Sequence, residues 1–598
     1  MAWSKLTFFS KALIVILVAG AIGAAVYFLS PGLRVDESKQ VEKLDISDKD
    51  VNNTTTSAEL PLPQSEVSTE VSSKPLVRIA GYAWNAQSGI IVANGGPKTT
   101  KGSLMEQNGV NLELVRQDWL SELRNLQMKF VEQFDQGQDY PKDGAAAIMI
   151  MGDGVPFYIS SAQQAIDEKY GQGKYQLQAV GAIGLSYGED KLIGPPSWKM
   201  NPQTMKGSLV SAVIGDGDWV TAVNYVSANG LKVNPDPATY DPTAVNFLAS
   251  ANDDYIESAK ELIKSQTQGW TVPLKEVKDG KLTGKTINKK VDGCATWTPG
   301  DKMVFDALTG FTDVVSTKEF NNQMATTVIF LKQWAEKHKD VVGNILKSSY
   351  IASNQMKQYD TWKRKASDAV AKSFGMENGD YWYNMFKGMQ GEKNGISYNM
   401  GGSRVFNLAD ANQYYGITDG VNRYKAVYDQ VSRYLKELNP AGFNQNVKKI
   451  VSYDDAVNPS YMKSIENIDA GATYKTDYTK KATNVVASGE WRINFDVGRA
   501  SIRPEGKDVL EQIYNLLVQA EDSKLELVGH TDNVGSPDAN YSLSTARAES
   551  VKSYLITKGI SANRFQKVDG KGADEPVADN SSASGRAQNR RVVISILK

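Results

Sequence analysis

Residues 525–560 read LELVGHTDNVGSPDANYSLSTARAESVKSYLITKGI, and this segment decides the fold expected for the end of the chain. Together with Lys524, its first residues up to His530 read KLELVGH, and this short run is interpreted as a strand. Apolar residues then recur at helical spacing from Ala546 to Gly559, where the glycine favours a helix end. The segment therefore predicts a strand, a polar loop and a helix, as in an α/β sandwich.

The flanking sequence extends this unit to a compact βαβαβ-type sandwich over residues 486–598. A strand is expected at Trp491–Phe495, and a helix is expected from Pro504 to Leu517, where apolar residues again recur at helical spacing. Two more strands are expected, at Phe565–Val568 and at Arg591–Ile596.

The segment quoted above, together with INFDVGRASIRPEG and NRRVVISI, resembles the OmpA-like peptidoglycan-binding family. The family pattern T-D-x-x-G, followed by N-x-x-L-S-x-x-R-A, is matched by Thr531, Asp532, Gly535, Asn540, Leu543, Ser544, Arg547 and Ala548. The resemblance implies non-covalent binding of peptidoglycan in a Gram-negative periplasm. It also implies that Asp532 receives the ammonium of the stem-peptide diaminopimelate and that Arg547 pairs with its carboxylate.

The chemistry of these two side chains agrees with such a ligand. A zwitterionic amino-acid end needs one anion and one cation held close together, and arginine binds carboxylates with two parallel hydrogen bonds. A loop after the strand and the first turn of the next helix are expected to hold Asp532 and Arg547. The alternative is that these two residues pair with each other. His530 is expected to orient the loop or to pack, and Arg590 and Arg591 to be structural or solvent-facing, with a weaker claim to wall binding.

The other end of the chain predicts a membrane anchor within residues 1–33. Ala12–Leu29 is an apolar run long enough, with its neighbours, to cross a bilayer. Lys5 and Lys11 precede it, which favours a cytoplasmic N-terminus and a periplasmic remainder. The expected location is thus the inner membrane, with a single pass. A cleaved signal peptide is the alternative, with a weak cleavage site among small residues near Ala21.

Between the two ends, the composition predicts a linker, a large domain and a connector. Residues 34–75 are polar and lack apolar periodicity, so a disordered linker is expected. Residues 76–442 alternate strand and helix patterns, which predicts an α/β domain, with an amphipathic helix at Phe320–Lys339. Residues 443–485 are less regular and are interpreted as a connector.

The large domain resembles the periplasmic substrate-binding proteins of ABC importers, especially the nitrate/taurine (NMT1-like) group. The resemblance rests on SGIIVANGG, NGVNLELV, SANGLKVNPD and DGCATWTPGD, and more on their arrangement than on any one motif. It implies two α/β lobes that clamp a small ligand at a hinge. The implied pocket is lined by Trp84, Asn85, Ser88, Asp153, Gly154, Asp216, Asp218, Trp297 and Thr298.

The nature of this ligand stays open. Backbone amides at strand-to-helix turns suit an anion, whereas the three aspartates suit an amine or hydroxyl groups. Gly-Asp-Gly sequences are also common simply as turns. The alternative function is a structural wall tether whose large domain docks another envelope protein and binds no solute.

The amino-acid composition argues against several other classes of function. The 598-residue chain has a net charge of −1, which gives no electrostatic case for nucleic acid, because such binding would need a basic face or stripe. Cys294 is the only cysteine, so neither an intrachain disulfide nor a cysteine-based metal site is expected. His338 and His530 are the only histidines, which argues against histidine-rich metal sites and a Ser-His-Asp base. We therefore expect neither an enzyme nor a metal or cofactor.

Overall fold

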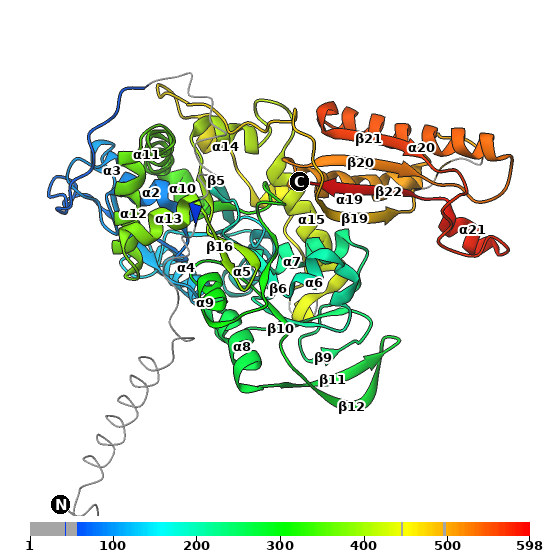
Figure 1. Cartoon of the computed structure of the whole chain (residues 1–598). Helices are drawn as coiled ribbons and strands as arrows, with labels where there is room; N and C mark the ends of the chain where they lie inside the picture. The colour runs from blue at the N-terminus through cyan, green and yellow to red at the C-terminus, as the bar shows by residue number, and fades with distance from the viewer. Residues whose placement is uncertain (1–41, 44–56, 444–446, 494, 496–497) are drawn as a thin grey trace, which may run out of the picture. The chain divides into compact units, whose positions relative to one another are not determined.

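The computed structural model describes residues 42–43, 57–443, 447–493, 495 and 498–598 (Figure 1). The predicted membrane anchor and most of the predicted linker lie outside these residues. Within the described part of the chain, no helix combines the length and apolar character needed to cross a bilayer. Before residue 57 the structure describes only Glu42 and Lys43, which form the short strand β1.

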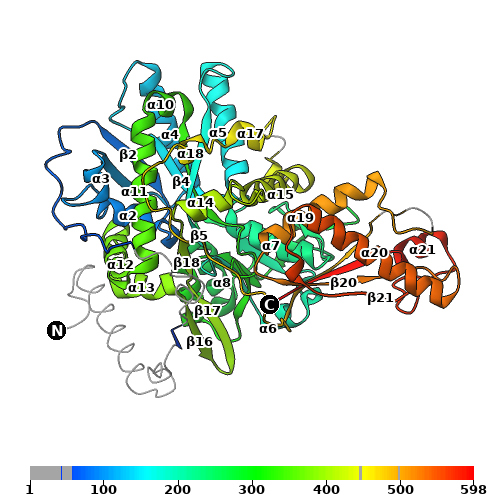
Figure 2. The same ribbon diagram turned by 90° about the horizontal axis from the view of Figure 1, so that it is seen from above.

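Lobe 1 of the large domain, which combines residues before and after lobe 2 in the sequence, is built on a six-stranded mixed sheet with the order β18-β5-β15-β4-β2-β3. Its strands are β2 (Leu76–Gly81), β3 (Asn111–Arg116), β4 (Ala147–Met151), β5 (Leu177–Ser186), β15 (Ala325–Leu331) and β18 (Ser403–Val405). The central strands are buried throughout, so both faces need cover by helices. The helices are η3 (Asn85–Gln87), α2 (Ser88–Asn94), α3 (Leu104–Gln107), α4 (Leu120–Asp135), α5 (Val155–Tyr170), α10 (Lys332–Lys337), α11 (Lys339–Gln358), α12 (Asp360–Phe374), α13 (Gly379–Lys387) and α14 (Leu408–Tyr414) (Figure 2).

The amphipathic helix expected at Phe320–Lys339 is wrong. The structure places β15 over Ala325–Leu331, between β4 and β5, and helix α10 begins only at Lys332. All seven residues of β15 are buried, and the run ATTVIFL is rich in β-branched side chains. Such a short apolar run suits a strand covered on both faces, and helical spacing within it was coincidental.

Lobe 2 is built on a second six-stranded sheet, with the order β14-β6-β13-β7-β10-β8. Its strands are β6 (Lys191–Gly194), β7 (Leu209–Ala212), β8 (Val233–Asn234), β10 (Val245–Ala249), β13 (Gly293–Thr296) and β14 (Thr312–Ser316). Its helices are α6 (Pro196–Met200), η4 (Pro202–Met205), α7 (Gly217–Ala228), η5 (Ala251–Asp253), α8 (Tyr255–Gln268) and α9 (Gly300–Ala307). The chain enters lobe 2 through residues 187–190 and returns through residues 317–324.

Two smaller sheets accompany the lobes. One has the order β12-β11-β9, from β9 (Thr239–Tyr240), β11 (Val272–Lys278) and β12 (Lys281–Lys289). The other contains the antiparallel pair β16 (Met389–Lys393) and β17 (Ile396–Met400).

The C-terminal module, residues 485–598, has a four-stranded sheet with the order β19-β22-β20-β21. Its elements are β19 (Val485–Trp491), η7 (Pro504–Gly506), α19 (Lys507–Gln519), β20 (Lys524–Gly529), α20 (Pro537–Thr557), η8 (Ala562–Arg564), β21 (Phe565–Gly570), α21 (Ala583–Asn589) and β22 (Val592–Leu597). The first strand of the module, β19, thus ends at Trp491, whereas the sequence predicted a strand that begins there and runs to Phe495. Helix α20 starts nine residues before Ala546, because Ser536 caps it and Pro537 occupies its first turn.

The chain on either side of the lobes packs against lobe 1. In the predicted linker, the backbone N–H groups of Gln64 and Ser68 donate to Lys101 and Thr99, and Val71 is buried. Residues 57–75 therefore differ from the disorder expected of them. The connector follows α15 (Arg423–Leu438) and η6 (Pro440–Gly442) and contains the short helices α17 (Tyr453–Ala456) and α18 (Ser460–Lys463). Val457 of the connector forms a parallel β-bridge with Ala179 of β5.

The module shares a hydrophobic core with lobe 2. Apolar residues of α7, α15 and α19 belong to one buried cluster, among them Val223, Val431 and Ile513. Polar contacts cross the same boundary, because the Asn224 amide of α7 donates to the Gln519 side chain of α19 at 2.9 Å. Lobe 2 and the module are therefore joined through buried side chains.

Candidate functional site

The first candidate site lies beside α20 in the C-terminal module, where three charged side chains meet. Asp532 comes from the loop after β20, Arg547 from α20 and Arg590 from the turn before β22. Asp532 and Arg547 are 9% and 4% exposed, so both charges are largely removed from water. Charged groups are buried in this way when a partner or a ligand compensates them.

Asp532 is held by the loop and by Arg590. One carboxylate oxygen accepts from the backbone N–H of Val534 at 3.1 Å, and the other accepts from Arg590 Nη1 at 2.6 Å. The amide of Asn540 donates to the Asp532 carbonyl, which fixes the loop to α20. Arg590 was expected to be structural or solvent-facing, with a weaker claim to wall binding, and its proximity to Asp532 had no signal in the sequence.

Arg547 is presented differently. Its Nε donates to the carbonyl of Arg499 at 3.2 Å, and its guanidinium lies 5.0 Å from the centre of the Phe495 ring. Burial lowers the pKa of Arg547, and the nearby Arg590 lowers it further, while Asp532 opposes both effects. Within the described residues Arg547 forms no ion pair, so the alternative of a direct Asp532–Arg547 pair is not what the structure shows. Arg547 lies about three turns into α20, not in its first turn as expected.

The other residues of the family pattern support the loop. Gly535 has a φ of 107°, which favours glycine, and Leu543 is half-buried on α20. The Thr531 N–H donates to Gly572, whose own N–H donates to Ser544 Oγ. Burial lowers the pKa of His530 to about 4, so this imidazole is neutral at pH 7.

The second candidate site lies between the lobes, where most of the predicted ligand-binding residues converge. Tyr82 of lobe 1 donates to Asp216 of lobe 2 at 3.1 Å, and Trp297 Nε1 donates to the Ala83 carbonyl at 3.3 Å. Asp153 of lobe 1 accepts from Gln323 at 2.7 Å. The residues predicted from separate loops are therefore brought together, with the exception of Ser88, which donates to Asn85 within its own turn.

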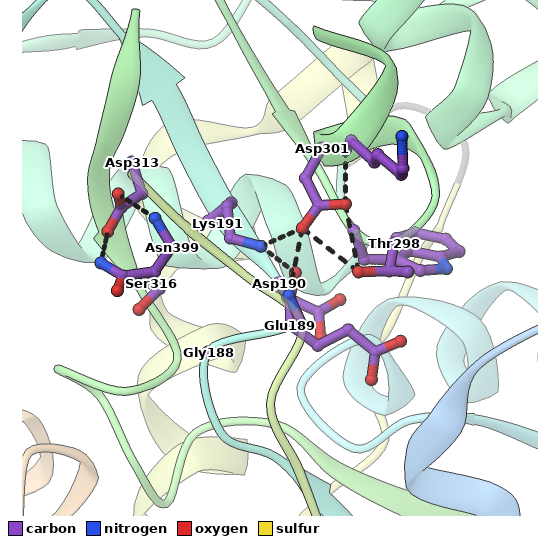
Figure 3. Close-up of polar contacts among 12 residues, drawn as sticks. Gly188, Glu189, Asp190, Lys191, Thr298, Asp301, Asp313, Ser316 and Asn399 are labelled. Atoms are coloured by element: carbon purple, nitrogen blue, oxygen red, sulfur yellow. Dashed lines mark hydrogen bonds and ion pairs between the residues drawn. The ribbon is translucent and has the colours of Figure 1, made fainter. Parts of the chain in front are cut away.

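Acidic side chains that the sequence analysis did not select complete this site (Figure 3). Asp190 accepts from Trp84 Nε1 at 3.1 Å, and Glu189 accepts from the Asn85 N–H. Lys191 lies among them, donating to Asp301 and, at 2.8 Å, to the Glu189 carbonyl. Thr298 also donates to Asp301 at 3.1 Å. Glu189 and Asp190 occupy the first crossover between the lobes and Lys191 begins β6, a placement that only the tertiary fold reveals.

The carboxylates outnumber the cations at this site, and burial is their main electrostatic feature. Burial raises the pKa of Asp190 to about 7 and that of Asp216 to about 6. It also raises the pKa values of Asp153, Asp218 and Glu189 well above their usual range. Among the residues that the structure describes, neither oxygen of Asp218 has a hydrogen-bond partner. Among the described residues, no group of His, Cys, Asp and Glu side chains has the arrangement of a metal site.

Comparison with known proteins gives a family match at the C-terminal end. Residues 494–590 match the OmpA family. The chain is 42% identical over 103 residues to outer membrane protein A of Bordetella avium, covering 17% of this chain and 53% of the relative. It is 36% identical over 118 residues to the probable lipoprotein YiaD of Escherichia coli (strain K12), covering 20% of this chain and 53% of the relative.

Among solved structures, the cell wall anchor of the T6SS from Pseudomonas aeruginosa is 32% identical, covering 20% of this chain and 86% of that chain, with a TM-score of 0.17. This chain spans about half the length of the two curated relatives above. The family match leaves the resemblance of residues 76–442 to substrate-binding proteins as a prediction. Residues 494–590 form an OmpA family domain.

Proposed function

We propose that this protein holds peptidoglycan non-covalently through Asp532 and Arg547, with the diaminopimelate of the stem peptide as the ligand. The observation that carries the proposal is the placement of one buried carboxylate and one buried guanidinium on neighbouring elements. The match of residues 494–590 to the OmpA family supports it, as does a relative named peptidoglycan-binding protein ArfA, from Mycobacterium tuberculosis (strain ATCC 25618 / H37Rv).

The geometry suggests how such a ligand would be recognised. Among the described residues Arg547 forms a hydrogen bond through Nε alone, to the Arg499 carbonyl, and its two Nη groups are the donors that we propose for a carboxylate. Asp532 is partly occupied by Arg590, whose side chain is 43% exposed and therefore able to move aside. A ligand ammonium would then take the place of the Arg590 guanidinium beside Asp532.

The proposal is tested by co-sedimentation of the full chain with peptidoglycan of the diaminopimelate type. Asp532→Ala and Arg547→Ala should each weaken binding at least about 30-fold, because each leaves one charge of the ligand without its partner. Asp574→Ala and Arg503→Ala, at exposed positions of the same module, serve as matched controls and should bind as the unaltered chain does.

Two outcomes would contradict the proposal. One is unaltered binding by both site variants, with thermal melts showing that they fold. The other is equal binding to peptidoglycan with lysine in the stem peptide, because lysine lacks the carboxylate that Arg547 is proposed to receive.

We also propose that the two lobes form a receptor for a small solute, bound at the acidic site between them. The supporting observation is Asp218, whose carboxyl group is fully buried and has no hydrogen-bond partner in the described part of the chain. An unpaired buried carboxyl costs stability, and such a cost is typical of functional sites. An ammonium or hydroxyl groups of the solute would supply the missing partners.

Asp218→Asn is expected to raise the melting temperature of the chain. The raised pKa means that folded Asp218 retains a proton that the unfolded chain releases above about pH 4. Its cost therefore grows as pH rises, by up to about 1.4 kcal/mol per pH unit, and the gain from asparagine should be larger at pH 8 than at pH 5. Asp340→Asn, at an exposed position of lobe 1, is the control. A lower melting temperature for Asp218→Asn would identify a structural carboxylate and remove the main support for the receptor.

The proposed arrangement is an inner-membrane anchor in residues 1–33, a linker in 34–75, the receptor in 76–442, a connector in 443–485 and the wall-binding module in 486–598. The second candidate function keeps the wall module but has the lobes dock another envelope protein. It is favoured by the extensive closure of the lobes over the acidic site, where Trp84, Asp153 and Thr298 have no exposed surface.

A further inference from the structure

A basic hairpin extends from lobe 2, formed by β11 and β12 (Figure 1). Its two-residue turn is Asp279–Gly280, with φ values of 51° and 75°, which suits the twist of a tight hairpin. Residues 272–290 contain six lysines against Glu276 and Asp279, and six minus two gives a net charge of +4. This segment is strongly basic in a chain whose total charge is −1.

The lysines near the tip are not neutralised by neighbours. Within the described residues Lys275, Lys278, Lys281 and Lys285 are exposed and form no ion pair. The Glu276 carboxylate instead accepts from Thr283 at 2.9 Å. Lys278 and Lys281 lie directly opposite each other across the two strands, and like charges in this position destabilise a hairpin. The positive tip is thus maintained at a cost to the fold.

An apolar side chain accompanies this charge. Leu282 is 61% exposed, follows Lys281 directly and pairs with the half-buried Val277 across the strands. Farther from the tip, Leu274 is buried in a separate apolar cluster with α8 and β13. Exposed leucine among lysines suits a membrane surface, because the ammonium groups meet headgroup phosphates while the apolar side chain enters the acyl boundary. Peptidoglycan offers carboxylates but no apolar phase.

We propose that the tip of the β11–β12 hairpin docks on an anionic phospholipid bilayer. The chain that precedes the described residues contains the apolar run Ala12–Leu29, which is long enough for a membrane span. Residues 30–56, which are 27 residues, separate that run from the segment packed against lobe 1, and a chain of this length spans at most about 95 Å, so lobe 1 cannot lie farther than this from the end of the run. This docking is independent of wall binding and of the solute proposed above.

A simpler role for the lysines must be separated from this one. β12 is an edge strand, and lysines on an edge strand protect it from pairing with other chains. That role requires no lipid. It predicts that neutral and anionic bilayers have the same effect on the hairpin.

The test uses the full chain with Thr283→Cys, labelled with an environment-sensitive fluorophore and reconstituted with phospholipid vesicles. Cys294 is fully buried, so the label reports on the hairpin. Vesicles of phosphatidylcholine alone are compared with vesicles that contain about 30% phosphatidylglycerol. We expect a blue shift and quenching by nitroxide-labelled lipid only in the anionic vesicles, and loss of both in high salt.

Replacement of Lys278, Lys281 and Lys285 by Gln should return the signal in anionic vesicles to that in phosphatidylcholine, since three lysines together change such binding on the order of 100-fold. Gln at the exposed Lys101, Lys129 and Lys339 of lobe 1 is the matched control and should leave the signal unchanged. Equal signals in the two kinds of vesicle, an unaffected triple variant, or a shift that appears only with added peptidoglycan would each overturn the proposal. Thermal melts confirm that each variant is folded.

Discussion

Replacing Lys191 with Met should destabilise the chain by about 3–5 kcal/mol, because it removes one partner of a buried ion pair. The side chains of Lys191 and Asp301 have no exposed surface. Asp301 would keep its contacts with Thr298 and with the N–H of Lys302, but it would lose its only cation among the described residues. The surrounding site, which holds several further carboxyl groups, would also lose a positive charge.

Denaturant unfolding of the full chain measures this effect. Lys260→Met is the control, because Lys260 and Glu257 are 51% and 31% exposed and form a surface pair at 2.6 Å, which contributes about 0–1 kcal/mol. The double variant Lys191→Met with Asp301→Leu should recover much of the loss, since no buried charge is left unpaired. A loss below about 1 kcal/mol in Lys191→Met would show that water reaches the pair and that the lobes open readily.

Arg564→Met, in the C-terminal module, should lower the free energy of unfolding by a similar amount, about 3–5 kcal/mol. This guanidinium is 1% exposed and donates to three backbone carbonyls, those of Leu517, Ala520 and Ser523, at 2.6–2.9 Å. The carbonyls lie at and just beyond the end of α19, where a helix has no partners of its own for them. A cation at this end also interacts favourably with the helix dipole.

The measurement is the unfolding of the module, followed by peptidoglycan co-sedimentation at increasing temperature. Arg564→Lys should recover only part of the stability, because an ammonium on a flexible chain does not reproduce the planar fork. Arg503→Met, at an exposed site, should change stability by less than about 0.5 kcal/mol. Full stability of Arg564→Met would mean that the helix end finds other donors.

The sequence predicted the elements of the C-terminal module better than their ends. The strand from Lys524 and the apolar positions of α20 are local patterns, and both appear in the structure. The start of α20 was placed too late because residues 537–545 are polar and carry no apolar periodicity, although Ser536 and Pro537 are local signals for a helix start. Short buried strands such as β15 were confused with helices because length and flanking residues, not spacing, distinguish the two.

The candidate sites show a different limit. Asp532 and Arg547 were selected because they belong to one sequence pattern, whereas Arg590 joins them from a distant turn. Between the lobes, Asp153, Asp216 and Asp218 were selected from turns after strands. Glu189, Asp190 and Asp301 were missed, because their proximity depends on how the chain crosses between the two sheets. Arg564 was missed for the same reason, since its three partners lie more than forty residues away.

The shared core of lobe 2 and the C-terminal module has a mechanical consequence. Arg423 of α15 donates to both carboxylate oxygens of Glu521, just beyond α19, and Asn224 of α7 reaches Gln519 at the end of the same helix. A force applied to the module would therefore reach lobe 2 through these contacts and the shared apolar core together. If the module holds the wall as proposed, a displacement of the wall would be transmitted to lobe 2 through buried side chains and not through a flexible linker.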